Sequence, residues 1–270
     1  MRSRQHTALG LAAAACLILS GCTNAADWNA NRSSQIHSYD TSSIQAQPDI
    51  IATLPQGALD DGVLDVAAST DYAPAEFLDP SGKAVGYDVD LTNAIAAVLG
   101  VKGKVHTAEF DSIIASIGSK YDAGISSFTV TPERTAEVDM TTYINVGSRF
   151  NVQAGNPKGV ETSDHLKLCG RTIGVQVGTG QEATMRKAAE NCANAGKDVL
   201  SVRSYSKQSE ATTGLVGGTI DATYSDSTVA GYAVELTDGQ IVTLGEVEDA
   251  APQGVVTSKA RSEEHTSELQ

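Results

Sequence analysis

Residues 86–100 have the sequence Gly-Tyr-Asp-Val-Asp-Leu-Thr-Asn-Ala-Ile-Ala-Ala-Val-Leu-Gly. Apolar side chains recur in this stretch at the spacing of one helix face, at Leu91, Ile95, Val98 and Leu99. Gly100 follows directly and suits the end of that helix. Upstream, Val63–Ala68 is a short apolar run bounded by polar turn residues, which predicts a buried strand. A strand and then a helix form the start of an α/β pattern.

The same alternation continues toward the C-terminus. Further helices are predicted around Ile113, Ile114 and Ile117 and at 182–194, and further strands at 123–126, 173–176 and 222–224. Strands that alternate with helices indicate parallel sheets in an α/β fold. Such sheets bind ligands beyond the carboxyl ends of their strands, so we look for the site there.

Composition limits the function. The 270-residue chain is 41% hydrophobic and carries 33 acidic against 19 basic residues, a formal net charge of −14. This length allows one large domain or two lobes with packed cores. The acidic balance argues against nucleic-acid binding, which needs a basic surface. No run of 18 apolar residues occurs, so the sequence predicts no transmembrane helix.

The N-terminus predicts export. Two arginines precede the apolar stretch Ala8–Leu19, and the following Ser20-Gly21-Cys22 completes a segment that resembles a bacterial lipobox. We expect residues 1–22 to be a lipoprotein signal, with a diacylglyceryl group on Cys22 that anchors the protein to the outer face of the cell membrane. The alternative is an ordinary secretory signal with an incidental cysteine. Residues 23–57 predict a flexible tether, because Asn, Ser, Ala and Gln dominate its first half.

The last ten residues, 261–270, are Arg-Ser-Glu-Glu-His-Thr-Ser-Glu-Leu-Gln. They match the translation of a common sequencing-library adapter, so we expect an artefact of gene assembly and a C-terminal truncation near residue 260. The alternative is a genuine polar tail.

Two cysteines remain in the exported part, Cys169 and Cys192. Disulfides persist outside the cytoplasm, so we predict that the two form one; the alternative is a pair of buried thiols. The histidines are scattered rather than clustered, so we predict no metal site and no cofactor.

The segment Ser126-Ser127-Phe128-Thr129-Val130-Thr131-Pro132-Glu133-Arg134 places hydroxyl groups between a strand end and a helix start. Thr131 is a good N-cap and Pro132 a good first helical residue. Free backbone N–H groups at a helix start attract anions, and Arg134 in the first turn can grip a carboxylate. The alternative is an ordinary capped helix with a surface arginine.

Two more strand-to-helix turns carry polar groups. The turn Val177-Gly178-Thr179-Gly180-Gln181 lets a ligand approach the backbone, although it lacks the Gly-Lys-Ser/Thr ending of a nucleotide-binding loop. Asp226 ends the last short strand and is a candidate partner for an ammonium group. Its alternative role, a helix N-cap, is compatible with the first.

Together these residues resemble the family 3 extracellular solute-binding proteins, the polar-amino-acid receptors of ABC importers. The resemblance runs from about Val63 to Lys259 and rests on Gly86–Leu91, Tyr72–Phe77, Ser126–Arg134, Gly178–Gln181 and Asp226, in the order of the family. It implies an α/β, type II periplasmic-binding-protein-like fold, with two lobes that each hold a mixed, mainly parallel sheet and are joined by two crossing strands. We place lobe 1 at 58–152, lobe 2 at 153–250 and a return strand to lobe 1 at 251–260.

The resemblance also implies a ligand and its contacts. An amino acid would bind between the lobes, with its α-carboxylate on Arg134 and its α-ammonium on Asp226. The other implied contacts are Ser69, Tyr72, Phe110, Ser126, Ser127, Thr129, Thr179, Gly180 and Gln181. The resemblance further implies a monomer whose closed, ligand-loaded form docks on an ABC permease. It implies a binding protein without catalytic residues.

Departures and alternatives remain. Ser69 lies where family members that bind cationic amino acids often have Asp, which disfavours such a ligand, although Asp71 lies two residues on. A dehydratase-like enzyme on the same fold would need a positioned acid or base, and the sequence offers only Asp226. A sensory domain is the other alternative, since sensors use the same ligand-binding fold.

Overall fold

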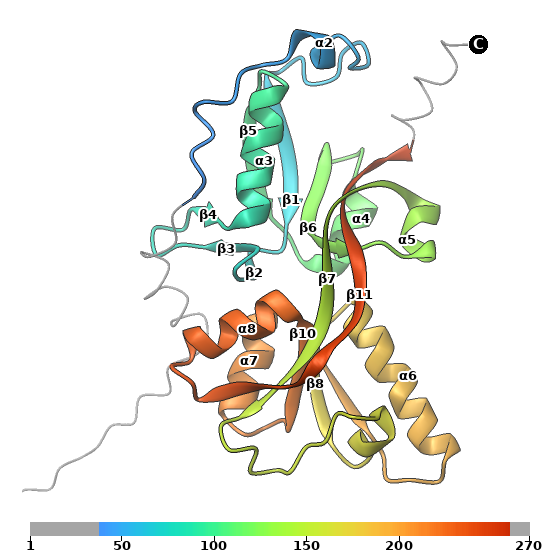
Figure 1. The fold of residues 1–270 in the computed structure, drawn as a ribbon. Coiled ribbons are helices and arrows are strands. Elements are labelled where there is room, and N and C mark those ends of the chain that lie inside the picture. The colour runs from blue at the N-terminus through green and yellow to red at the C-terminus, as the bar shows by residue number, and fades with distance from the viewer. Residues whose placement is uncertain (1–37, 260–270) are drawn as a thin grey trace, which may run out of the picture.

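The computed structural model describes residues 38–259. The predicted signal with Cys22, the first part of the tether and residues 261–270 lie outside the described residues. Two lobes are joined by the long antiparallel strands β7 (Val138–Gln153) and β11 (Ile241–Ser258), which pair along their length (Figure 1). Within residues 38–259 no helix has the length and apolar character to cross a membrane.

Lobe 1 contains the parallel strands β5, β1 and β6, with one end of β11 antiparallel to β6. Helices α3 and α4 pack on this sheet, and a small three-stranded sheet lies on the side that faces lobe 2 (Figure 1). The bounds are α2 (Pro48–Ile51), β1 (Val63–Ala68), β2 (Asp71–Tyr72), β3 (Glu76–Leu78), β4 (Ala84–Val85), α3 (Tyr87–Val98), β5 (Lys102–Thr107), α4 (Phe110–Ser116), β6 (Ala123–Thr129) and α5 (Pro132–Glu137).

Lobe 2 repeats the arrangement with the parallel strands β9, β8 and β10, and β10 is antiparallel to β7. Its core is fully buried and includes Phe150, Leu168, Ile173 and Met185. The bounds are η2 (His165–Leu168), β8 (Thr172–Gln176), α6 (Gly180–Asn194), β9 (Ser201–Tyr205), α7 (Gln208–Val216), β10 (Ala222–Asp226) and α8 (Ser227–Leu236). The single sheet order β5-β1-β6-β11-β7-β10-β8-β9 shows that β7 and β11 connect the two lobes.

The helices and strands predicted from periodicity are present, with shifted ends. The strand predicted at 123–126 continues to Thr129, and the one at 222–224 continues to Asp226. The helix predicted at 182–194 begins at Gly180, because the Thr179 side chain accepts a hydrogen bond from the Glu182 N–H and caps it. The lobe boundaries at residues 152 and 250 stay a prediction.

The predicted disulfide is confirmed. Cys169, directly after η2, is bonded to Cys192 on α6, with Cα atoms 5.6 Å apart and a sequence separation of 23. Cys192 is fully buried in the lobe 2 core. The bond therefore ties α6 to the segment that leads into β8.

Replacing both cysteines by alanine is expected to lower the free energy of unfolding by about 3 kcal/mol, because a cross-link of this span restricts the unfolded chain. Denaturant unfolding followed by circular dichroism measures it. A reducing agent should destabilise the parent and leave the double variant unchanged. An equal effect of the reductant on both would contradict the prediction.

Candidate functional site

A small, closed cavity lies between the lobes. Strands β6, β8 and β10 each contribute their carboxyl-terminal residues to it, as expected for parallel strands in an α/β fold. Its lining residues are Tyr72, Phe110, Ser126, Ser127, Thr129, Arg134, Gln176, Thr179, Gly180, Gln181 and Asp226. Ten of the eleven residues proposed from sequence thus lie together, Ser69 lies outside the lining, and Gln176 is an addition.

Arg134 enters this cavity from lobe 1. Thr131 caps α5 as predicted and accepts a hydrogen bond from the Arg134 backbone N–H at 3.3 Å. The guanidinium donates to the carbonyl oxygens of Thr129 (2.7 Å) and Gly178 (3.1 Å), and it lies 5.4 Å from the ring centroid of Phe110. Burial lowers the pKa of Arg134, yet an arginine with a pKa above about 12 in water keeps its charge. Arg134 is thus half-buried and lines the cavity, and its role in binding stays a prediction.

Asp226 enters from lobe 2 and is 3% exposed. Its Oδ1 accepts a hydrogen bond from Gln181 Nε2 at 2.7 Å, and its Oδ2 accepts one from Gln253 Nε2 at 2.6 Å. Burial raises its pKa from 3.8 to about 6. Asp226 holds the N-cap position of α8 but makes no side-chain capping bond, so its carboxylate is directed toward the cavity residues instead.

The two carboxylate oxygens of Asp226 have room for more donors. Each oxygen accepts one amide hydrogen bond, and an ionised carboxylate offers about four acceptor positions. Among the lining residues Arg134 and Asp226 are the charged ones, of opposite sign, and the charge of Asp226 raises the pKa of Arg134 against the effect of burial. The cavity can therefore neutralise both ends of a small zwitterion.

The glycine-rich turn serves the site differently from what its sequence suggests. Gly178 has φ +77°, and a Cβ placed there would lie 2.8 Å from the Cβ of Asp111 on α4. Glycine is thus required at 178 by its backbone conformation and by the close approach of Asp111 from the other lobe. Gly180 has open space around it and begins α6, so its backbone N–H lies at the anion-attracting end of a 15-residue helix.

Ser69 lies behind the cavity wall. Its backbone N–H donates to Ser126 Oγ at 2.9 Å, and its hydroxyl donates to Asp71 Oδ1 at 2.9 Å. Gln176 Nε2, from lobe 2, donates to the same hydroxyl at 3.1 Å. Burial raises the pKa of Asp71 to about 6. Ser69 therefore links a buried acid in lobe 1 to a polar cavity residue in lobe 2.

Sequence reasoning missed Gln176 and Gln253. Gln176 is the last residue of a predicted strand, so the rule that ligands bind at strand ends could have indicated it. Gln253 lies in the middle of β11 and is fully buried, and no local pattern marks it.

Several hydrogen bonds cross between the lobes at this cavity. They join Arg134 to Gly178, Gln176 to Ser69, and the Asp226 N–H to Tyr72 Oη, the last at 3.1 Å. The structure is therefore a closed form, in which groups from both lobes meet around the cavity.

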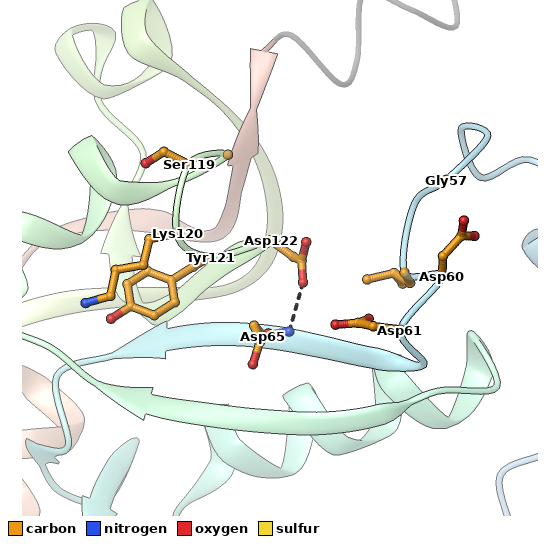
Figure 2. A pocket seen from close by; sticks show the side chains of 10 residues that line it. Gly57, Asp60, Asp61, Asp65, Ser119, Lys120, Tyr121 and Asp122 are labelled. Atoms are coloured by element: carbon orange, nitrogen blue, oxygen red, sulfur yellow. Dashed lines mark hydrogen bonds between the residues drawn. The ribbon is translucent and has the colours of Figure 1, made fainter.

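A second, larger cavity lies in lobe 1, and Figure 2 shows its side chains. Its acidic residues are Asp60, Asp61, Asp65 and Asp122, with Lys120 as the one cation of its lining. The Asp65 N–H donates to Asp122 Oδ2 at 2.9 Å, as the dashed line in Figure 2 marks. In the described part of the chain no three His, Cys, Asp or Glu side chains are grouped to hold a metal ion. This surplus of negative charge would repel a carboxylate, which favours the interlobe cavity as the site.

Comparison with known proteins agrees with this geometry. Residues 64–235 match the family model of bacterial extracellular solute-binding proteins, family 3. The chain belongs to this family. A family 3 relative, the arginine-binding protein ArgT of Corynebacterium glutamicum, is 32% identical over 77% of this chain and 68% of its own.

Other relatives differ in their named ligands. The L-cystine-binding protein TcyJ of Escherichia coli is 29% identical over 75% of this chain and 73% of its own. The structure of an ancestral arginine-binding protein bound to arginine superposes with a TM-score of 0.69, at 32% identity, and covers 76% of this chain and 88% of that one. These relatives confirm the two-lobed α/β fold and the assignment of this chain to the amino-acid-binding proteins of family 3.

Proposed function

We propose that this protein captures an amino acid between its lobes and delivers it to the permease of an ABC importer, while Cys22 anchors it to the outer face of the membrane as a lipoprotein. The observation that carries the proposal is the meeting of Arg134 and Asp226 in one cavity from opposite lobes. Their opposite charges correspond to the two charged groups of an α-amino acid.

The lining residues support a specific assignment of contacts. The α-carboxylate would bind Arg134, the hydroxyls of Ser127 and Thr129, and the free N–H of Gly180 at the start of α6. The α-ammonium would bind Asp226, and Tyr72 and Phe110 would flank the side chain. Since a closed cavity unites both sets of contacts, binding would favour the closed form and mark the loaded protein for the permease.

Binding without catalysis fits this lining best. General acid–base catalysis needs a proton donor or acceptor beside the reacting group, in addition to the groups that hold the substrate. The charged residues of the lining, Arg134 and Asp226, are both assigned to binding. The other lining groups are hydroxyls, amides and aromatic rings, which suit recognition.

The side chain of the ligand would meet Tyr72, Phe110 and Gln176, with Ser69 and Asp71 behind them. Relatives bear names of arginine- and cystine-binding proteins, so family membership leaves the ligand's side chain open.

Calorimetric titration of the exported chain with each of the twenty amino acids tests the proposal. We expect one-to-one binding of one amino acid or a small group of related ones, with no turnover in the recovered ligand. Mass spectrometry of the mature N-terminus tests the lipid on Cys22. Failure of all twenty to bind, or their chemical conversion, would contradict the proposal.

Binding is expected to weaken as the pH falls below about 6. The α-ammonium needs an ionised Asp226, whose pKa is about 6, and the charges of a neutral-side-chain amino acid stay constant from pH 8 to pH 5. At pH 5 only roughly a tenth of the Asp226 carboxyls are ionised, so the dissociation constant should rise about tenfold relative to pH 8. Calorimetry at both pH values measures it. The pKa of Asp71 lies in the same range. The variant Asp71→Asn distinguishes the two acids, because it should keep most of the loss of affinity between pH 8 and pH 5 if Asp226 causes that loss.

A further inference from the structure

Two buried carboxyl groups lie directly behind the serines of the interlobe cavity. Glu76 on β3 and Asp88 on α3 are each 1% exposed. Glu76 Oε1 accepts a hydrogen bond from Ser126 Oγ at 2.5 Å, and Asp88 Oδ2 accepts one from the Ser127 N–H at 2.8 Å. Neither carboxyl lines the cavity, so neither is available to a ligand.

Asp88 also reaches a crossing strand. Its Oδ1 accepts a hydrogen bond from Tyr143 Oη at 2.7 Å, and Tyr143 lies on β7, which runs from lobe 1 into lobe 2. Ser127 has φ +52°, a left-handed conformation that is costly for a residue with a side chain. The bonds from the Ser127 N–H (2.8 Å) and hydroxyl (3.3 Å) to Asp88 therefore hold Ser127 in a conformation it would otherwise avoid.

We propose that Glu76 and Asp88 share a single proton, which resides on Glu76, that the protonated Glu76 positions Ser126 in the cavity, and that the charge left on Asp88 positions Ser127 and joins it to Tyr143 of β7. Both are positioning residues. The pairing itself does not depend on the ligand, and only its consequence for amino-acid binding rests on the proposed function.

The surroundings decide which carboxyl keeps the proton. Burial raises the pKa of both groups, and the charge of Asp88 together with its hydrogen bond to Glu76 raises the pKa of Glu76 further. Hydrogen bonds from Tyr143, Ser127 and Glu76 oppose the rise at Asp88. Asp88 also lies in the first turn of the 12-residue helix α3, where a negative charge is favoured.

The neighbouring groups agree with one negative charge in this pocket rather than two. Glu76 Oε2 is buried and has no hydrogen-bond partner among the described residues, so an ionised Glu76 would leave a charged oxygen without a donor. The other titratable groups near the pair are Asp71, Tyr72, Tyr87, Tyr143 and Asp226. Among residues 38–259 no ion pair joins a Lys or Arg to Glu76 or Asp88. Two carboxylates here would lack a compensating cation.

The two isosteric variants Glu76→Gln and Asp88→Asn test the proposal, and each is the control for the other. Glutamine can replace a protonated Glu76 bond for bond, since its oxygen accepts from Ser126 and its amide donates to Asp88. Asparagine at 88 removes the charge that three donors share. At pH 8 we expect the melting temperature of Glu76→Gln to stay within about 2 °C of the parent, and that of Asp88→Asn to fall by at least about 5 °C.

Two spectroscopic measurements distinguish a role of Glu76 and Asp88 in positioning the two serines from a role in packing alone. The infrared band of a protonated carboxylic acid should be present in the parent at pH 8 and absent from Glu76→Gln. Hydrogen exchange of the Ser127 amide should quicken at least about tenfold in Asp88→Asn and stay unchanged in Glu76→Gln. If Asp88→Asn does not fold, the infrared band and the stability of Glu76→Gln still decide the matter.

The proposal would be overturned if the infrared acid band persisted in Glu76→Gln, or if the two substitutions lowered the melting temperature equally. None of these measurements uses a ligand. Failure of the protein to bind amino acids would therefore count against the proposed function. It would not bear on the shared proton, which the infrared, exchange and melting measurements test.

Discussion

Replacing Arg134 by alanine is expected to weaken amino-acid binding by at least about 30-fold, because a buried charged partner of the ligand is worth roughly 2–5 kcal/mol. The α-carboxylate would lose a two-pronged donor in a cavity that offers it no other cation. Calorimetry with the best ligand of the twenty-amino-acid screen measures the change. Binding by Arg134→Ala as tight as that of the parent would show that the carboxylate lies elsewhere.

Two matched variants make the Arg134 result specific. Arg134→Lys keeps the positive charge but not the planar fork, so an intermediate loss of about tenfold is expected. Arg203→Ala removes an exposed arginine on β9, which contacts the Tyr205 ring and lies outside the cavity lining, and it should leave the affinity unchanged. Circular dichroism of all three variants distinguishes lost contacts from lost folding.

Features with a local cause could be predicted from the sequence. Thr131 and Pro132 start α5 as their capping preferences indicate, because a cap is made within one turn of chain. The pair Cys169 and Cys192 is confirmed for a similar reason, since two cysteines in an exported segment leave one possible partner each. The strands predicted at 123–126 and 222–224 end three and two residues later, at Thr129 and Asp226, because their last residues pair with distant strands.

Features that depend on contacts between distant segments could not be predicted. Gln253 reaches Asp226 from a strand that returns across the lobes, and periodicity within β11 carries no trace of that contact. The sequence also gives no sign that Glu76 and Ser126, fifty residues apart, share a hydrogen bond in the buried interior. The role of Gly178 changed for the same reason, since its neighbour Asp111 belongs to the other lobe.

Replacing Asp226 by asparagine is expected to have two opposite effects. It should weaken amino-acid binding at pH 8 by at least about 30-fold, because the α-ammonium loses its charged partner. It should also stabilise the ligand-free protein at pH 8, by up to about 3 kcal/mol in the free energy of unfolding. The second effect follows from burial, which raises the pKa of Asp226 from 3.8 in the unfolded chain to about 6 in the folded one.

The sign of the stability effect depends on pH. Below about pH 3.8 the acid is protonated in both states, so Asp226→Asn and the parent should be equally stable. Between about pH 3.8 and pH 6 the unfolded parent has released a proton that the folded parent still holds, so the stability of the parent falls relative to the variant in this range, and the gap has its full size above pH 6. Denaturant unfolding at pH 4 and pH 8 measures the gap.

A neutral side chain at position 226 can still satisfy its neighbours. Gln253 Oε1 is buried and has no hydrogen-bond partner among the described residues. A rotation of the Gln253 amide would therefore present an acceptor to the amide group that Asp226→Asn introduces, in place of the donor that it presents to the Asp226 carboxylate.

Asp198→Asn, at an exposed position, is the matched control and should change neither binding nor stability. Keeping the buried Asp226 ionised at pH 8 lowers the free energy of unfolding of the ligand-free protein. Binding of the ligand's ammonium group to Asp226 offsets this loss. An Asp226→Asn variant that neither gained stability nor lost affinity would contradict both halves of this account.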